Sequence, residues 1–530
     1  QAEDGIRDRS PSRGLGDVYK RQDEEMESLP EGLEIVSIDV IPPAVSLKSG
    51  FEYRQIQFRG NLKTGETADL TRMVKLTTKP ATVAVSALGL VTPVADGQEQ
   101  LTYVCQGLEV TVAVEVRGAQ QTPPISFVQD VQPTFSRLGC NAGTCHGSRT
   151  GKNGFKLSLR GYDSLFDHRA FTDDIGARRL NRAAPDQSLM LLKATGSIPH
   201  VGGVRTNPST TYYQMIRQWI AEGAKLDLDA PRVQSVEILP QNPVLPRAGM
   251  RQQMTVLATY QDGSVRDVTR EAFIESGNIE VLEADERGLL TLLRRGESPV
   301  LVRYEGAYAA TTLTAMGDRT GFAWQEPEHY NYIDKHVYAK LQRVKILPSE
   351  VCGDAEFLRR VYLDLTGLPP EIEATRKFLA DPSPSREKRA ALVDQLIGNP
   401  EYVEHWTNKW ADMLQVNRKF LGEQGSIAMR NWIKDVVARN QPYDETARQI
   451  LTASGSTIES PPASYFKILR DPALIMENTT HLFLAVRFNC NKCHDHPLEK
   501  WTNDQYYAMA NLFARVRAKG WGAIPAVARE

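Results

Sequence analysis

The chain has 530 residues, 41% hydrophobic and 24% charged, and its 63 Lys and Arg against 65 Asp and Glu give a formal charge of −2. This composition is typical of folded globular domains, about three or four at this length, and excludes a mainly disordered chain. The balanced charge argues against nucleic acid as a partner. No run approaches the roughly 20 apolar residues of a membrane-spanning helix, so we expect a soluble chain with no transmembrane segment.

The two ends of the chain differ from its middle. Residues 1–22 mix charge, Gly and Ser without hydrophobic period or helix cap, and we interpret them as an artefactual or disordered tail. No signal peptide is visible there. The C-terminal residues also stop without an obvious closing element, so we expect the last domain to be truncated.

Two β-sandwiches are predicted over residues 33–118 and 232–317. Both segments alternate apolar and polar residues in short runs separated by Gly, Pro and Asp turns. They are also repeats of each other, because equivalent residues recur at a constant spacing of 198. The matched residues are Pro42, Gly65, Asp69 and Thr71, then Pro240, Gly263, Asp267 and Thr269. A register held over this length indicates an internal duplication.

Helical patterns fill the remaining regions, residues 124–230 and 325–530. ISFVQDVQPTFSRLGC and TTYYQMIRQWIAEGA each place apolar residues on one helical face, and a glycine-rich loop lies between them. In DAEFLRRVYLDLTGLPP we expect Asp354 to be the N-cap and Gly367 to end the helix. The expected architecture therefore alternates two all-β domains with two mainly α-helical domains.

Four of the six cysteines fall in two short clusters, each followed by histidine. FNCNKCHDHP contains Cys490, Cys493 and His494 in C-x-x-C-H spacing. Two thiols about one helical turn apart can add to the vinyl groups of haem, and the adjacent histidine can then bind the iron as an axial ligand. This cluster therefore predicts covalently attached haem c.

The first cluster, GCNAGTCHG, contains Cys140, Cys145 and His146, with four residues between the thiols instead of two. The Cys-His dipeptide downstream of another thiol is intact, so we predict a second haem c site here, which makes one or two haems in all. Neither cluster requires a catalytic acid or base, and we expect an electron carrier rather than an enzyme.

Other chemistry also suits these residues. Zinc binds Cys and His. The short segment that contains Cys490, Cys493, His494 and His496 cannot place all four side chains on one ion, so zinc would need a further ligand such as His481. A local disulfide or a redox-active cysteine pair are further alternatives at both clusters. An enzyme acting on envelope polysaccharide has support only from scattered acidic residues, with no readable carboxylate pair.

A six-coordinate haem needs a second axial ligand, usually Met or His. For the first cluster we prefer His200, because IPHVGG places it on a loop where glycines let the backbone approach a porphyrin edge. The other candidates there are His168, Met190 and Met215. The last domain offers Met413, Met509, His405 and His481, among which the sequence does not choose. Cys105 and Cys352 lie in separate domains and are expected to be free thiols.

These segments together resemble known families. FVQDVQPTFSRLGCNAGTCHGSRTGKNGFKLSLRGYD with WIAEGA resembles the planctomycete-type cytochrome c domain. FLRRVYLDLTGLPP, LIGNPEYVEHWTNKWADML and CNKCHDHPLEKWTNDQYY resemble the helical cytochrome c-like domain of unknown function from the same proteins. The Gly-x-x-x-Asp-φ-Thr turns of both repeats resemble bacterial immunoglobulin-like domains of group 2. The chain departs from the cytochrome pattern in its longer cysteine spacing and in having Pro199-His200 where a Met-Pro loop is usual.

The resemblance implies a multidomain protein of two Ig-like sandwiches alternating with a cytochrome c-like domain and a C-terminal helical domain. It also implies a periplasmic or cell-surface location and iron ligation by His146 and His494. We expect electron transfer or redox sensing at the cell envelope with an unidentified redox partner protein, and surface or polysaccharide contact through the Ig-like domains. The alternative is a surface adhesion or scaffold protein with structural zinc or disulfide sites.

Overall fold

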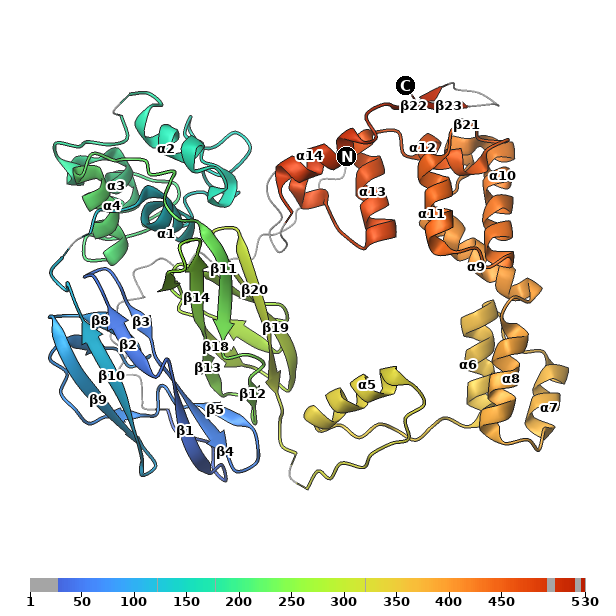
Figure 1. Ribbon diagram of the computed structural model, residues 1–530, viewed down its shortest axis with the longest axis horizontal. Helices are drawn as coiled ribbons and strands as arrows, with labels where there is room; N and C mark the ends of the chain where they lie inside the picture. Colours follow the sequence, from blue (N-terminus) through green and yellow to red (C-terminus); the bar gives the residue numbers. More distant parts are fainter. Residues whose placement is uncertain are drawn as a thin grey trace. The chain divides into compact units, whose positions relative to one another are not determined.

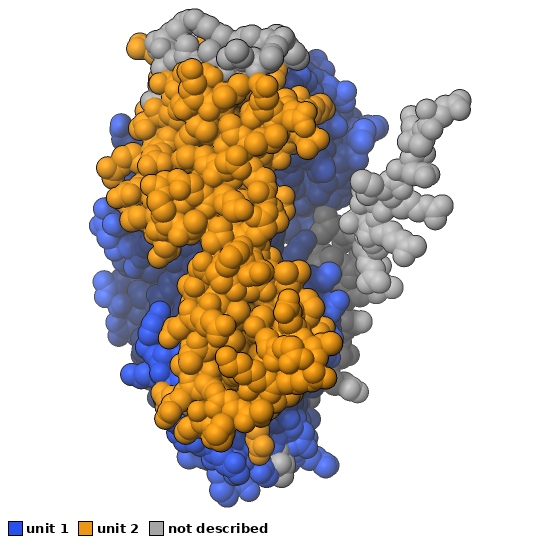
Figure 2. Space-filling view, turned by 90° about the vertical axis from the view of Figure 1, so that its right-hand side faces the viewer, with its two compact units in different colours: residues 1–347, 497–500 blue, residues 348–496, 501–530 orange. Residues whose placement is uncertain are grey.

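The computed structural model describes residues 27–121, 123–176, 178–319, 321–492, 501–519 and 526–529. They form two compact units, which are coloured separately in Figure 2. Unit 1 takes the described residues up to Leu347 and carries both β modules, and unit 2 begins at Pro348 and is mainly helical (Figure 1). The predicted β-sandwich-like and helical regions are therefore confirmed.

The first β module consists of three small sheets, with strand orders β1-β4-β5, β2-β10-β9-β6 and β3-β8-β7. Its long hairpin pairs β9 with β10, and β2 joins β10 in parallel. The strands are β1 Ile35–Ile41, β2 Ala44–Leu47, β3 Arg54–Gln55, β4 Gln57–Leu62, β5 Thr67–Asp69, β6 Lys75–Leu76, β7 Val83–Val85, β8 Leu90–Pro93, β9 Gly97–Cys105 and β10 Leu108–Val116.

The second β module repeats this topology strand for strand, with orders β11-β14-β15, β12-β20-β19-β16 and β13-β18-β17. Its strands are β11 Val233–Leu239, β12 Val244–Leu245, β13 Arg251–Gln253, β14 Thr255–Tyr260, β15 Val265–Asp267, β16 Phe273–Ser276, β17 Leu282–Ala284, β18 Leu289–Leu292, β19 Gly296–Tyr304 and β20 Ala307–Ala315. The identical strand orders support the duplication inferred from the sequence.

The repeated Asp-x-Thr turns explain why those residues recur. In the first module Asp69 Oδ1 accepts from Thr71 N at 2.8 Å, and Thr71 Oγ1 accepts from a backbone N–H of β4. Asp267 and Thr269 make the same two bonds in the second module, at 3.1 and 2.8 Å. Each turn thus satisfies buried backbone donors that the short strands leave unpaired.

The two modules contact each other through equivalent residues. Asp267 Oδ2 accepts from Gln55 N at 2.7 Å, and Asp69 Oδ2 accepts from Gln253 N at 2.6 Å. Each member of the second bond lies 198 residues from its counterpart in the first, so the contact has the reciprocity of a two-fold interface. Buried apolar side chains of both modules also form one continuous cluster. The β modules therefore act as one body.

Short helices make up the region between the modules. A π-helical turn, Phe127–Val131, runs into α1 Gln132–Arg137, and α2 Ser164–Thr172, α3 Leu189–Ala194 and α4 Thr211–Ala221 follow. The predicted apolar stripes on the first and last of these helices are buried together around Trp219. The second β module holds this region through an ion pair of Arg266 with Asp130 at 2.9 Å and a bond from Tyr212 to Glu271 at 3.2 Å.

Unit 2 is a set of helices with three apolar clusters. Before it, α5 Tyr332–Arg343 lies in unit 1, where Lys340 pairs with Glu297 at 2.5 Å. The helices of unit 2 are α6 Asp354–Thr366, α7 Ile372–Ala380, α8 Ser385–Leu396, α9 Pro400–Met413, α10 Arg418–Ala438, α11 Tyr443–Thr452, α12 Ser464–Ile468, α13 Pro472–Leu484 and α14 Asn503–Asn511. A small sheet joins β21 Gly455–Ser456, β23 Ala526–Arg529 and β22 Val516–Lys519.

One helix boundary differs from its prediction. The N-cap of α6 is Gly353, and Asp354 is the first helical residue. The Asp354 carboxylate instead pairs with Lys388 and Arg389 of α8, each at 2.7 Å, which removes it from capping geometry. The other end agrees, because Gly367 closes α6 with a left-handed φ of 71°. None of the helices in the described part of the chain has the length and apolar character needed to cross a membrane.

Candidate histidine pair and cysteine clusters

A tight loop presents His146 from the end of α1. The His146 N–H donates to Cys140 O at 3.0 Å, so the segment from Cys140 to His146 closes on itself. Gly147 must be glycine, because a Cβ there would lie 2.0 Å from the carbonyl oxygen of Asn141. The glycine at position 147 is therefore a packing requirement of the loop that carries the histidine.

The ring of His146 is fixed by Phe155. Its Nδ1 lies 3.1 Å from Phe155 O and must carry the proton, because a carbonyl can only accept. The Phe155 ring packs on the imidazole with centroids 4.6 Å apart. Burial lowers the pKa of His146, and the nearby positive charges of Arg179 and Lys152 lower it further. The arrangement favours a neutral imidazole with the lone pair on Nε2, which is the form that binds metal ions.

His200 is held in the same way on its own loop. Its Nδ1 lies 3.0 Å from Gly203 O, which again leaves Nε2 with the lone pair. A Cβ on Gly202 would come within 2.8 Å of His200 Cε1, so the ring occupies space that only glycine leaves open. The rings of His146 and His200 lie 6.4 Å apart between centroids and are within 7° of parallel.

This spacing can be compared with what one metal ion requires. A metal–nitrogen bond of about 2.0 Å and about 1.1 Å from Nε2 to the ring centre would put two imidazoles bound to one ion roughly 6.2 Å apart between centroids. The observed 6.4 Å agrees with that value. The centroid distance therefore matches that of two imidazoles that would bind a single ion.

The two thiols of the first cluster are half-buried, and neither forms a disulfide within the part of the chain that the structure describes. Burial raises the pKa of Cys140 to about 12, partly opposed by the positive charge of Arg205, so Cys140 is a neutral thiol at physiological pH. Its side chain packs against the apolar core of the helical region. Cys105 and Cys352 are free as well, in agreement with the prediction.

The other candidate ligands of this region have different contacts. His168 Nε2 lies 2.8 Å from Ala224 O, and its ring packs against Phe127 and Trp219. Met215 Sδ accepts from the Thr134 hydroxyl at 3.6 Å. Met190 packs on the apolar core. Only His200 among the four lies beside His146.

Arg179 supports the histidine pair and carries no sequence motif that would predict it. Its buried guanidinium donates to Ala170 O at 2.7 Å and to Gly154 O at 3.2 Å, and it lies 4.5 Å from the centroid of the Phe155 ring. It therefore fixes the residue whose carbonyl orients His146. The role of the Phe155 carbonyl cannot be predicted from the sequence either, because any residue type could supply a carbonyl.

The second cluster is described only in part. Cys490 is exposed on a helical turn, Asn489–Lys492, whereas Cys493 and His494 lie outside the described residues, as does His496. Of the candidate partners, His481 and Met413 are exposed, and Met509 packs beside Tyr506. His405 has a buried Nε2 without a hydrogen-bond partner among the described residues. Haem and zinc at this cluster remain predictions.

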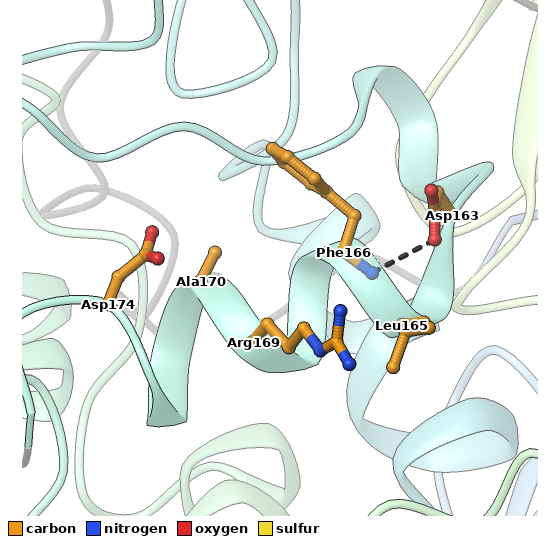
Figure 3. Close-up of a pocket in the computed structure, with 6 residues that line it drawn as sticks. All are labelled: Asp163, Leu165, Phe166, Arg169, Ala170 and Asp174. Carbon is orange, nitrogen blue, oxygen red and sulfur yellow. Dashed lines mark hydrogen bonds between the residues drawn. The ribbon is translucent and has the colours of Figure 1, made fainter.

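A pocket of about 270 Å³ lies on α2 (Figure 3). Asp163 and Asp174 stand at its opposite ends, and Asp163 caps the helix by accepting from Phe166 N at 2.9 Å. The pocket contains no cysteine or histidine, so we assign it no role in the site. Within the described ranges no group of three or more His, Cys, Asp or Glu side chains is arranged to hold a metal ion.

Comparison with known proteins bears mainly on the C-terminal region. Residues 332–518 match the family model described as "PSCyt2: Protein of unknown function (DUF1549)", which confirms that part of the resemblance seen in the sequence. The match defines a planctomycete-type, cytochrome-associated domain without an assigned activity. No curated protein sequence matches the chain.

Several solved structures of surface proteins share a limited likeness. Domains 4–9 of the surface layer protein SbsC are 11% identical with a TM-score of 0.22, over 54% of this chain and 32% of that one. SbsC domains 5–6 are 12% identical with a TM-score of 0.21, over 53% and 99%. The extracellular domains 3–5 of Drosophila OTK give 8% and 0.12, over 54% and 63%. The chain thus spans about a third of the first structure, and scores this low carry no functional weight.

Proposed function

We propose that the protein is an extracytoplasmic c-type haem protein that transfers electrons or senses redox state at the cell envelope. The observation that carries this proposal is the histidine pair, parallel within 7° at 6.4 Å with both Nδ1 atoms bound to backbone carbonyls. A porphyrin supplies four nitrogen ligands of its own, so His146 and His200 would be the two further ligands that such an iron takes from the protein. Zinc takes four protein ligands, of which this pair supplies two.

The residues of the candidate site would have separate roles in holding the haem. His146 and His200 would bind the iron, and Cys140 and Cys145 would hold the haem edge by thioether bonds. Phe155 O and Gly203 O orient the two rings, and Arg179 fixes the Phe155 side. When bound, haem supplies one-electron chemistry, and the protein sets its potential through the ligands and their burial. The β modules provide a rigid support for this region.

The proposed location rests on the chemistry of haem attachment and not on the solved structures that share a likeness with the chain. Haem is attached to thiols outside the cytoplasm, so a covalent site at the cysteine clusters would put the protein in the periplasm or on the cell surface. Surface or polysaccharide contact through the Ig-like modules is part of the same proposal. An adhesion or scaffold protein with zinc or disulfide at these clusters is the alternative.

Expression with periplasmic targeting and a haem-attachment system tests the proposal. We expect a red protein whose colour survives denaturation and extraction with acidified acetone. The double variant Cys140→Ser, Cys145→Ser should lose covalent haem at the first site, whereas Cys352→Ser, in another domain, should not. A colourless protein that contains stoichiometric zinc would overturn the proposal in favour of the scaffold.

A further inference from the structure

The segments that build the histidine pair contain no acidic residue. Residues 131–162 and 187–221 have no Asp or Glu, although 65 acids among 530 residues would put about eight there. The same segments contain eight basic residues. They are Arg137, Arg149, Lys152, Lys156, Arg160, Lys193, Arg205 and Arg217. A chain with a net charge of −2 therefore carries a strongly positive region at its candidate site.

Most of these cations form no ion pair with the residues that the structure describes. Arg217 pairs with Asp186 at 2.9 Å, and Arg137 donates to Ala272 O at 3.3 Å in the second β module. The other six make no ion pair with the residues that the structure describes, and four of them are exposed. Unpaired exposed cations contribute little to folding stability, so their concentration here calls for a role outside the fold.

Three of the six cations lie beside the histidine pair. Lys193 Nζ donates to Pro199 O at 2.6 Å, next to His200. Lys152 N donates to Phe155 O at 2.9 Å, the same carbonyl that orients His146. The Arg205 guanidinium lies 3.8 Å from where a Cβ on Gly139, the residue before Cys140, would stand. These three cations thus lie at the site itself.

The loop of His200 also presents apolar surface. Val201 is fully exposed, at 102% of its reference area, and Val204 is 47% exposed. A small exposed apolar tip near basic residues is typical of an interface that associates transiently, where the apolar centre excludes water and the charged rim steers encounter.

We propose that this basic face, formed by Arg149, Lys152, Lys156, Lys193, Arg205 and Val201, docks an acidic redox partner protein over the His200 edge. The inference rests on the proposed function, because a partner that exchanges electrons must approach the metal ligand closely. Carboxylates of the partner pair with the lysines and arginines, and Val201 enters the centre of the contact. Up to two of the cations can serve the propionates of a bound haem, which leaves the remaining ones for the partner.

The test uses the full-length protein and two triple variants with the same change in net charge. Arg149→Glu, Lys152→Glu, Lys156→Glu reverses exposed charges of the basic face. Lys48→Glu, Lys75→Glu, Lys79→Glu reverses three exposed lysines of the first β module, none of which forms an ion pair among the described residues. Circular dichroism establishes that both variants fold.

Two probes are compared at low and physiological ionic strength. Binding of poly-L-glutamate, measured by fluorescence anisotropy with apo or holo protein, should weaken about tenfold or more in the first variant and stay within about twofold in the second. Electron exchange of the holoprotein with anionic ferrocyanide should slow by a similar factor, whereas exchange with cationic hexaammineruthenium should accelerate. Both effects should shrink with added salt.

The outcomes separate the two proposals. Equal losses in both triple variants, or no binding of poly-L-glutamate by the wild type, would overturn the docking face whatever the haem content. Binding of heparin without binding of poly-L-glutamate would overturn it in favour of a sulfated polysaccharide. A protein that binds poly-L-glutamate through the basic face but takes up no haem would support a docking surface for an acidic protein and refute the redox function.

Discussion

Replacing Gly202 by alanine perturbs the histidine pair through a single methyl group. Gly202 has an ordinary backbone conformation, so the change introduces no left-handed strain. The new Cβ would lie 2.8 Å from His200 Cε1, against about 3.5 to 4.0 Å for a normal carbon contact. The ring must therefore move by roughly 0.7 to 1.2 Å, whereas metal–ligand distances hold within about 0.2 Å.

We expect Gly202→Ala to weaken or break ligation by His200 with little effect on folding, because the loop is at the surface. The assay is the visible spectrum of the oxidised holoprotein, in which loss of one axial histidine converts low-spin to high-spin haem. Gly176→Ala is the matched control, since its Cβ would meet no atom within 4 Å and its φ is ordinary. A Gly202→Ala spectrum identical to that of the wild type would refute the steric reasoning and the ligand role of His200.

Three further perturbations have defined outcomes. Arg179→Gln removes a buried positive charge near His146 and should lower the reduction potential of a haem bound there, with Arg179→Lys closer to wild type; potentiometric titration measures both. Asp267→Asn removes the charged acceptor of three hydrogen bonds and should cost about 2 to 3 kcal/mol by urea unfolding, unlike the exposed Asp262→Asn. Burial raises the pKa of Glu305 to about 8, so the folded state binds more protons than the unfolded state between about pH 4.5 and 8. Stability should therefore fall as pH rises through that window, and Glu305→Gln should flatten the profile; a rise would contradict the assignment.

The sequence predicts the β modules well because their signals are local and repeated. A period of two, turn residues at a fixed spacing and a register of 198 residues are all visible without coordinates. It does not predict the hydrogen bonds by which Asp69 and Asp267 each accept from a backbone N–H of the other module. Either carboxylate could equally have accepted hydrogen bonds only within its own turn. Contacts between repeats depend on tertiary packing, which periodicity does not encode.

The candidate site was predicted only where its residues carry a local signal in the sequence. His146 follows from a motif, and His200 was preferred because of its glycine-rich loop, which is also the feature that leaves room for its ring. Phe155 O and Arg179 could not be found, since a backbone carbonyl has no sequence signature and Arg179 lies 33 residues from the histidine it supports. The N-cap expected at Asp354 was wrong because two basic residues of α8 compete for its carboxylate.

Ligation by both histidines is tested most directly by paramagnetic resonance of the oxidised holoprotein in a Cys490→Ser, Cys493→Ser background. The near-parallel rings of His146 and His200 predict a rhombic low-spin signal of iron with two imidazole ligands. His200→Gly should convert this signal to high-spin, and free imidazole should restore it, whereas the exposed His336→Ala should leave it unchanged. A low-spin signal that survives in His200→Gly without added imidazole would contradict the account.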